Sequence, residues 1–159
     1  VNVLYPLPQQ LGTVAHHPLV TCFVSFVACV GFVIVFNIHG HGNLLCALGG
    51  AITWGAYCLA LYFGCSNYLC CFIATCAAAV FSELMARVRK YPAISYLVIS
   101  LLPLIPGAGI YYCALYAIRG DTAMAFQYGI DTLAVAGVMA AGILVISTAV
   151  RMWTAHKAR

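Results

Sequence analysis

The fold of this chain follows from residues 93–118, AISYLVISLLPLIPGAGIYYCALYAI. This stretch carries no charge and exceeds the roughly 20 mainly apolar residues that a membrane-spanning helix needs. An interruption rich in proline and glycine begins about ten residues in, which places it roughly 15 Å deep and close to the bilayer midplane. We therefore predict a transmembrane helix that is broken at Pro103–Gly109.

The whole chain is as apolar as this stretch. Its 159 residues are 65% hydrophobic and 6% charged, and its mean hydropathy is +1.03. A typical soluble domain is about 25% charged and about half apolar, and a soluble chain this short cannot bury so much apolar surface in one core. The net charge of +4 is too small for a nucleic-acid-binding surface. The composition predicts an all-α integral membrane protein that binds no nucleic acid.

Short polar or glycine-containing breaks divide the chain into five apolar stretches. We predict transmembrane helices over residues 18–38, 43–63, 67–85, 93–118 and 122–150. Loops as short as these make neighbouring helices antiparallel. Residues 18–151 then form a single five-helix membrane domain, preceded by an irregular or interfacial lead-in over residues 1–17 and followed by a short basic cytoplasmic tail over residues 152–159.

The basic residues predict the orientation of the five helices. Six of the seven follow the third and fifth helices, which end on the same side of the membrane: Arg87, Arg89, Lys90, Arg151, Lys157 and Arg159. Arg119 alone lies on the opposite side. Cytoplasmic loops are those rich in Lys and Arg, so we predict a cytoplasmic C-terminus and an N-terminus outside.

The interrupted helix is the first candidate site. Each of its two prolines lacks an N–H, so the carbonyl one turn earlier has no helical donor. Pro103 affects the carbonyl of Ile99, and Pro106 affects that of Leu102. Backbone polar groups at this depth must be buried in protein or line a wet cavity, and many secondary transporters use broken midplane helices as ligand sites. A packing kink is the alternative interpretation. The predicted substrate-binding residues of this segment are Pro103, Pro106, Gly107 and Gly109, with the Tyr111 hydroxyl close by.

Asp131 is the only acidic residue well inside a predicted span. Ionisable groups in such positions usually face a cavity, a partner or a proton path, so Asp131 is a candidate coupling residue. Gln127 lies one turn earlier on the same helix face and is a candidate substrate contact. The alternative is a structural role, in which Asp131 pairs with the freed backbone of the broken helix.

Three further residues have both a functional and a structural interpretation. Glu83 lies four residues before Arg87, and an i,i+4 ion pair explains it more simply than a coupling role. Asn37, at the end of the first span, caps or turns the chain, bonds across helices or contacts substrate. Trp54 lies in the middle of the second span, where it packs or lines a cavity.

The sequence contains no catalytic or cofactor-binding pattern. All five histidines lie outside the predicted spans, and no G-x-S-x-G, P-loop or dinucleotide-binding motif occurs. Most cysteines lie in apolar runs without zinc-type spacing, where they act as small apolar residues. We therefore predict a protein that is not an enzyme and that holds no metal or cofactor.

Several ordered segments resemble a known family of membrane proteins. They are FVIVFN (residues 32–37), LCALGGAITWG (45–55), FSELMAR (81–87), YPA (91–93), PLIPG (103–107) with Tyr111, G-x-x-TL (129–133) and AGI (141–143). This series, over roughly residues 30–151, resembles the C-terminal membrane half of the bacterial threonine/serine exporter family. It is most similar to the free-standing small subunit of the split form of that family.

The resemblance implies a subunit of a secondary-active, multi-pass exporter in the bacterial inner membrane. Family members export threonine and serine, and split members are associated with succinate export. Fused members carry a second, larger half, so the resemblance implies a larger partner subunit in addition to membrane lipids and a small-molecule substrate. It transfers no substrate contact to this chain, and the role of Asp131 is a physical inference.

Two other functions remain open at this point. The chain is alternatively a membrane scaffold that stabilises a transporting partner, or a homo-oligomeric channel or metal-handling protein that uses His and Cys. The sequence also does not separate amino-acid from dicarboxylate substrates, because both carry small carboxylates that a helix N-terminus accepts.

Overall fold

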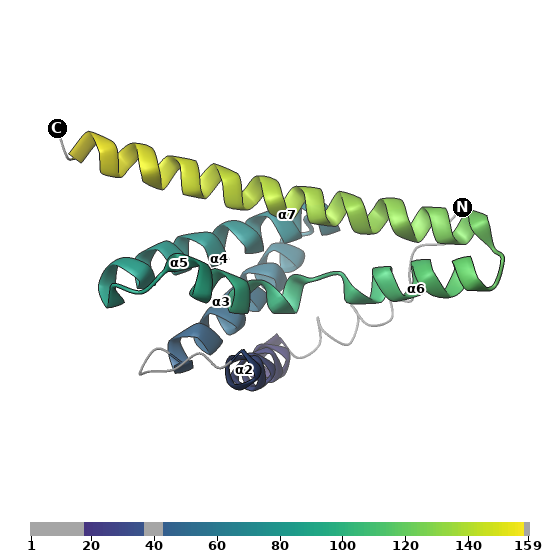
Figure 1. The fold of residues 1–159 in the computed structure, drawn as a ribbon, viewed down its shortest axis with the longest axis horizontal. Coiled ribbons are helices and arrows are strands. Elements are labelled where there is room, and N and C mark those ends of the chain that lie inside the picture. Colours follow the sequence, from purple (N-terminus) through teal and green to yellow (C-terminus); the bar gives the residue numbers. More distant parts are fainter. Residues whose placement is uncertain (1–17, 37–42, 158–159) are drawn as a thin grey trace.

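The computed structural model describes residues 18–36 and 43–157. Those residues form helices joined by short turns and contain no strand (Figure 1). In chain order the helices are α2 (Pro18–Val35), α3 (Asn43–Tyr62), α4 (Asn67–Arg89), α5 (Ala93–Leu101), the 3-10 helix η1 (Leu102–Leu104), α6 (Gly107–Ile118) and α7 (Thr122–Lys157). The predicted lead-in, residues 1–17, lies outside the described residues.

Among the described helices, four are long and apolar enough to cross a membrane, namely α2, α3, α4 and α7. A fifth span results if α5 with η1 is counted together with α6, although the pair is bent by 57° at a short break. The structure therefore confirms an all-helical protein with four to five candidate membrane spans and a break in the fourth. The orientation of the two termini stays a prediction.

Two helices extend further than the sequence predicts. α4 continues past Met85 to Arg89, where Lys90 takes a left-handed conformation (φ 57°) and ends the helix. α7 continues past Val150 to Lys157, because no proline or glycine interrupts residues 143–157. Most of the predicted basic tail is therefore the end of a 36-residue helix.

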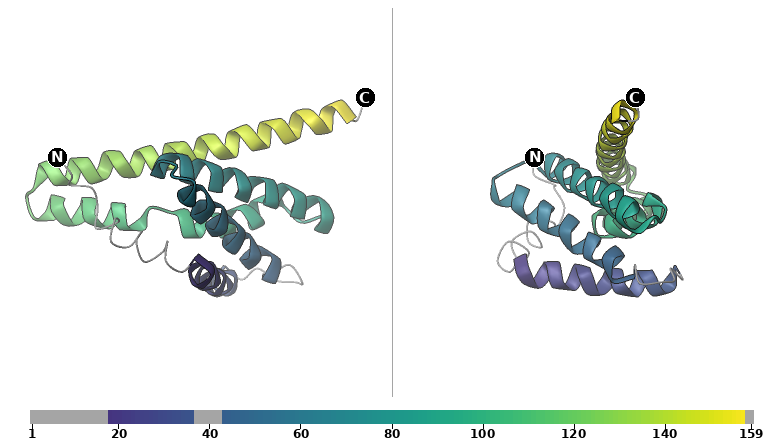
Figure 2. Two further views of the ribbon diagram at one scale, coloured as in Figure 1. Left: turned by 180° about the vertical axis from the view of Figure 1, so that it is seen from behind. Right: turned by 90° about the vertical axis from the view of Figure 1, so that its left-hand side faces the viewer.

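α3 and α4 form the centre of the molecule. α3 packs against α2, α4, α5 and η1, and α4 packs against α3, α5 and α7. Glycines allow the closest approaches, because a Cβ atom on Gly49 would collide with the Ser100 hydroxyl and the Phe81 ring. A Cβ atom on Gly50 would collide with the Cys29 thiol. α6, by contrast, packs mainly along α7, away from this centre (Figures 1 and 2).

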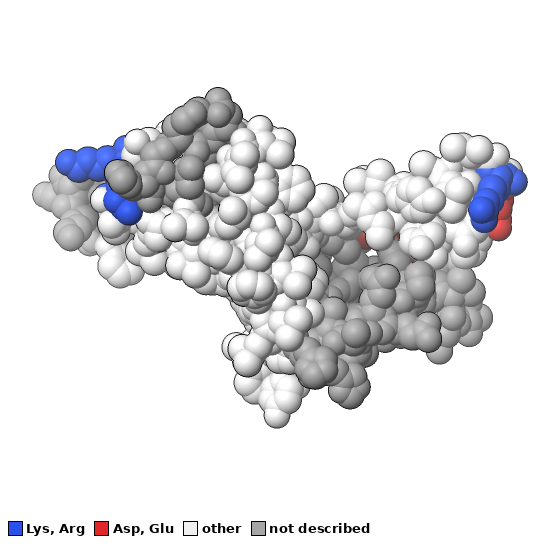
Figure 3. Space-filling model, turned by 90° about the horizontal axis from the view of Figure 1, so that it is seen from below, with Lys and Arg blue, Asp and Glu red and all other residues white. Residues whose placement is uncertain are grey.

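The exterior is apolar between two charged ends. Seen from below, Lys and Arg side chains lie at one far end of the molecule, basic and acidic side chains lie together at the other, and the described surface between them is nearly free of charge (Figure 3). Large apolar side chains such as Leu19 and Ile118 are 86% exposed. An apolar belt between two polar ends matches the bilayer interior and its two interfaces.

Candidate functional site

The break in the fourth helix is shorter than the predicted segment Pro103–Gly109. Pro103 lies within η1, and the non-helical residues are Ile105 and Pro106. Gly107 begins α6, so both glycines of the segment are helical rather than unwound. Pro106 explains why the break is short, because its φ of −77° and its missing N–H suit the start of a helix.

The two carbonyls that the prolines deprive of donors find new ones. The Leu102 N–H donates to the Ile99 carbonyl, which the Cys29 thiol also approaches at 3.6 Å. The Ile105 N–H donates to the Leu102 carbonyl at 3.3 Å. The prolines alone predict that these two carbonyls lack donors. In the structure both have one, because the chain tightens into a 3-10 turn that bonds them locally.

A cavity of about 170 Å³ lies at the break. All four backbone positions that the sequence singles out in this segment line it: Pro103, Pro106, Gly107 and Gly109. The remaining walls come from three other helices and include Trp54 and Tyr57 of α3, Asn67 and Cys71 of α4, and Val135 of α7. The break thus lies where α3, α4 and α7, which are far apart in the sequence, come together around one cavity.

The cavity wall combines hydrogen-bond donors with an apolar lining. α6 begins without a side-chain cap, and the Gly107 N–H donates to the Ile105 carbonyl (2.7 Å), so the N–H groups of Ala108 and Gly109 are the ones left without an acceptor within the helix. The Tyr57 hydroxyl donates to the Asn67 side-chain oxygen (2.8 Å), which leaves the amide N–H groups of Asn67 as donors. Among the described residues, no charged side chain lines the cavity. Uncharged donors at a helix N-terminus suit an anionic group on a small ligand.

Trp54 both packs and lines the cavity, as its mid-span position predicts. Its ring stacks on Tyr57 with a centroid separation of 5.3 Å. Its buried indole N–H has no hydrogen-bond partner among the described residues. A buried donor without an acceptor is unfavourable.

Sequence reasoning missed Tyr57 and Asn67. Asn67 is the first residue of α4, directly after the N-cap residue Ser66, and a polar residue at a helix start does not stand out. Tyr57 is one of ten tyrosines. No spacing along the chain connects the two residues, because they meet through the packing of α3 on α4. The signal that could have found them is weak: both are polar residues in or beside apolar spans.

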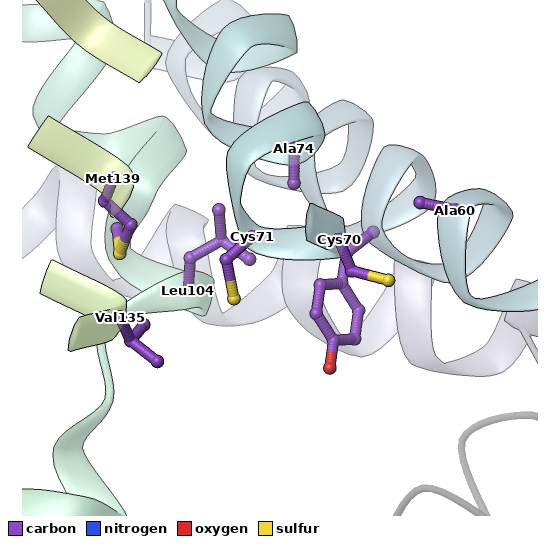
Figure 4. Close-up of a cluster of buried hydrophobic side chains, with 8 residues drawn as sticks. Ala60, Cys70, Cys71, Ala74, Leu104, Val135 and Met139 are labelled. Atoms are coloured by element: carbon purple, nitrogen blue, oxygen red, sulfur yellow. The ribbon is translucent and has the colours of Figure 1, made fainter. Parts of the chain in front are cut away.

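Leu104 fixes the break against the rest of the molecule. Its side chain is 6% exposed and lies between Val135 and Met139 of α7 on one side and Cys71 of α4 on the other (Figure 4). Close packing, rather than escape from water, holds helices together in a membrane. The contacts of Leu104 therefore position the cavity wall relative to α4 and α7.

Asp131 lies beside the cavity rather than in its lining. Its Oδ1 atom accepts a hydrogen bond from the Tyr68 hydroxyl (3.1 Å), and Asp131 is half-buried. Val135, one turn further along α7, does line the cavity. The alternative prediction is a structural pairing of Asp131, for example with the freed backbone of the broken helix; the partner in the structure is Tyr68 of α4.

The other predicted site residues lie away from the cavity. Gln127 on α7 and Tyr111 on α6 are exposed, and neither lines it. Asn37 lies outside the described residues. Glu83 lies near the far end of α4, about 22 Å along the helix from the turn that bonds Asp131. The structure therefore does not bring Glu83 and Asp131 into one site.

The ion pair predicted between Glu83 and Arg87 does not form. Arg87 donates from Nη2 to the Thr154 hydroxyl on α7 (2.8 Å), and Glu83 makes no ion pair with any residue in the described part of the chain. The reason is tertiary, because α7 passes alongside α4 and offers Arg87 an acceptor that the sequence spacing does not reveal.

Comparison with known proteins identifies the family. The family model described as "Threonine/Serine exporter, ThrE" matches residues 21–149, which include every residue that lines the cavity. The curated proteins and the solved structures compared with the chain give no significant match. The family match confirms the resemblance seen in the sequence, and the chain belongs to the threonine/serine exporter ThrE family.

Proposed function

We propose that this chain is one subunit of a secondary-active exporter of small polar metabolites, and that the substrate binds in the cavity at the break. Membership of a transporter family supports transport rather than catalysis. The observation that carries the proposal is a cavity among candidate membrane spans, bounded by the uncapped start of a half-helix. Secondary transporters bind anionic groups at such half-helix N-termini.

The cavity favours a small ligand that carries a carboxylate. Its volume of about 170 Å³ lies below the roughly 300–1,000 Å³ of pockets for drug-sized ligands. The first turn of α6 and the amide of Asn67 supply donors for a carboxylate. Threonine and serine, after which the family is named, meet this description, and so does succinate. We propose these three compounds as the candidate substrates.

Two consecutive residues connect the cavity to Asp131. Asn67 accepts a hydrogen bond from Tyr57 at the cavity, and Tyr68 donates one to Asp131. When Asp131 takes up a proton, a charge-assisted hydrogen bond becomes a neutral one of about half the strength. That change acts on the same turn of α4 that carries Asn67. We therefore propose Asp131 as the residue that couples proton movement to export.

An open polar face on α7 supports a larger partner subunit. Gln127 and Asp131 lie one turn apart on the same face, and Gln127 is exposed. Polar groups inside membrane spans face a partner, a cavity or the interior of a helix bundle rather than lipid. We propose that the larger subunit of the split exporter covers this face in the bacterial inner membrane. In this arrangement the basic end of α7 is cytoplasmic.

Efflux from proteoliposomes tests the proposed function. The vesicles hold this chain with its larger partner, or the partner alone, and are loaded in turn with labelled threonine, serine or succinate. Efflux is followed with and without a pH gradient. We expect gradient-sensitive efflux of one compound that requires both chains. No efflux of any compound, or equal efflux by the partner alone, would contradict the proposal and favour a scaffold.

A metal-handling role gains no support from the structure. Within residues 18–36 and 43–157, no group of three His, Cys, Asp or Glu side chains is placed to hold a metal ion. His39 and His41 lie outside those residues.

A further inference from the structure

A second hollow lies far from the cavity, between α4 and the C-terminal half of α7. This groove has a volume of about 450 Å³. Val80 and Leu84 of α4 and Ile146 and Val150 of α7 form its apolar part. The proposed function uses none of these residues, so the groove is a separate feature of the molecule.

The polarity of the groove changes along its length. α4 and α7 run in the same direction, and their C-terminal ends lie at the same end of the molecule (Figures 1 and 2). From Val80 to Arg87 on α4, and from Ile146 to Trp153 on α7, the lining covers about 10 Å of each helix. The groove is therefore apolar at its deep end and carries an arginine and a tryptophan at its outer end.

Arg87 is held at the outer end with donors to spare. Its Nη2 atom donates to the Thr154 hydroxyl at 2.8 Å, which fixes the guanidinium group against α7. A guanidinium group has five N–H donors in a planar fork that matches phosphate oxygens. Trp153 lines the same end and is 75% exposed. Exposed tryptophans are typical of the headgroup level of a membrane.

The surrounding charge at this end is positive. Lys90 follows α4 directly, and Arg151 lies in the same turn of α7 as the groove residues Val150 and Trp153. Glu83 lines the groove one turn below Arg87 and opposes an anion there. The basic residues outnumber this single carboxylate, so the outer end attracts an anionic headgroup.

We infer that this groove binds an anionic phospholipid, with the phosphate on Arg87, Trp153 beside the headgroup, and one acyl chain along the apolar part. Basic pockets between membrane helices at a cytoplasmic surface recognise anionic lipids in this way. A transmembrane helix is about 10–12 Å wide with its side chains, too wide to enter a groove between two packed helices. An acyl chain is thin enough to fit. It would lie along the apolar part of the groove and place its headgroup at the basic outer end. The inference requires a membrane location and is independent of the proposed substrate cavity.

Lipid binding to the purified, detergent-solubilised chain tests this inference. Native mass spectrometry compares phosphatidylglycerol with phosphatidylcholine of identical acyl chains on the wild type, Arg87→Gln and Arg119→Gln. Arg119 is the matched control, because it lies at the other end of the molecule, beyond α6. We expect Arg87→Gln to weaken phosphatidylglycerol binding about fivefold, the usual effect of one basic residue at a membrane surface, and Arg119→Gln to have no effect.

Two further variants separate the headgroup from the acyl chain. Glu83→Gln removes the opposing carboxylate and should tighten phosphatidylglycerol binding, whereas Ala149→Phe fills the groove and should weaken binding while every charge is kept. Arg87→Lys should restore most of the affinity that Arg87→Gln loses. Circular dichroism confirms that each variant stays helical.

Four results would overturn the inference. They are equal losses in Arg87→Gln and Arg119→Gln, equal affinity for the two lipids, full competition by soluble glycerol phosphate, and protection of the groove by the larger partner instead of lipid. The third would mean an anion site without an acyl chain. The fourth would mean a protein interface.

Discussion

The two arms of the broken fourth helix are equally apolar but have different surroundings. α5 packs against both α3 and α4, and Tyr96, Ile99 and Ser100 are at most 2% exposed. α6 packs mainly along α7, and Gly109 is its one residue in the buried class. The first arm is therefore part of the packed centre of the molecule, whereas the second is half of a helical hairpin.

The difference has its cause in the size of the facing side chains. Gly49 lets α5 approach α3 so closely that Ser100 occupies the space of a missing Cβ. Tyrosine rings fill the contact between α6 and α7, where Tyr112 and Tyr116 both lie against Tyr128. Proteins open first where fewest contacts must be broken. We therefore expect the cavity to open on the α6 side of the break.

The largest expected effect concerns Asp131, on the hairpin side. Asp131→Asn should keep the hydrogen bond from Tyr68, because an amide oxygen still accepts it, but the side chain no longer carries a proton. We expect assembly to be kept and the gradient-driven part of efflux to be lost entirely. Proteoliposome efflux with and without a pH gradient measures this.

Asp121→Asn is the control for that experiment. Asp121 accepts the Met124 N–H at the start of α7 and is exposed, outside the apolar belt. Its variant should retain full gradient dependence. Unchanged gradient-driven efflux in Asp131→Asn would remove Asp131 from the coupling mechanism.

One added methyl group should disturb the packing of α5 on α3. Gly49→Ala places a Cβ against Ser100 and Phe81, and overpacking of this kind costs about 1–3 kcal/mol. Gly137→Ala on α7 adds the same methyl group where nothing lies within 4 Å. Unfolding in mixed micelles should therefore show a clear loss of stability for Gly49→Ala and none for Gly137→Ala. Equal stabilities would mean that α5 is not held by this close approach.

A smaller change should affect the hairpin alone. The Tyr116 and Tyr128 rings are stacked 5.5 Å apart, and such a pair contributes about 0.5–1.5 kcal/mol beyond its packing. Tyr116→Leu should speed hydrogen exchange in peptides from α6 and leave α5 unchanged, as measured by mass spectrometry in nanodiscs. Tyr62→Leu, at a residue that is 84% exposed, should change neither. Faster exchange in both arms would show that they open together.

The helices and the break were predictable from sequence because their causes are local. Apolar runs of spanning length, separated by glycine and charge, locate the start of each predicted span. Pro106 sets the break itself, since a residue without an N–H and with a fixed φ starts a new helix. The ends of α4 and α7 were less predictable. Basic residues mark where a membrane span ends, but the helix continues through them.

The walls of the cavity were not predictable, because tertiary packing assembles them. Tyr57 meets Asn67 across α3 and α4, and Tyr68 meets Asp131 across α4 and α7. Arg87 likewise bonds Thr154 on α7 instead of the glutamate one turn before it on its own helix. In each case the chain satisfies a polar group with a partner from another helix, which no spacing within one helix reveals.

Efflux from proline variants tests directly whether the break creates the transport site. Threonine, serine and succinate efflux is compared for the wild type, Pro103→Ala/Pro106→Ala and Pro18→Ala, each reconstituted with the larger partner. Pro18 is the first residue of α2 and does not line the cavity, so its variant controls for the loss of a proline. The double variant allows one continuous helix to form from α5 to α6, which removes the uncapped start of α6. We expect efflux to be lost in the double variant and kept in Pro18→Ala, whereas wild-type efflux by the double variant would reduce the break to a packing kink.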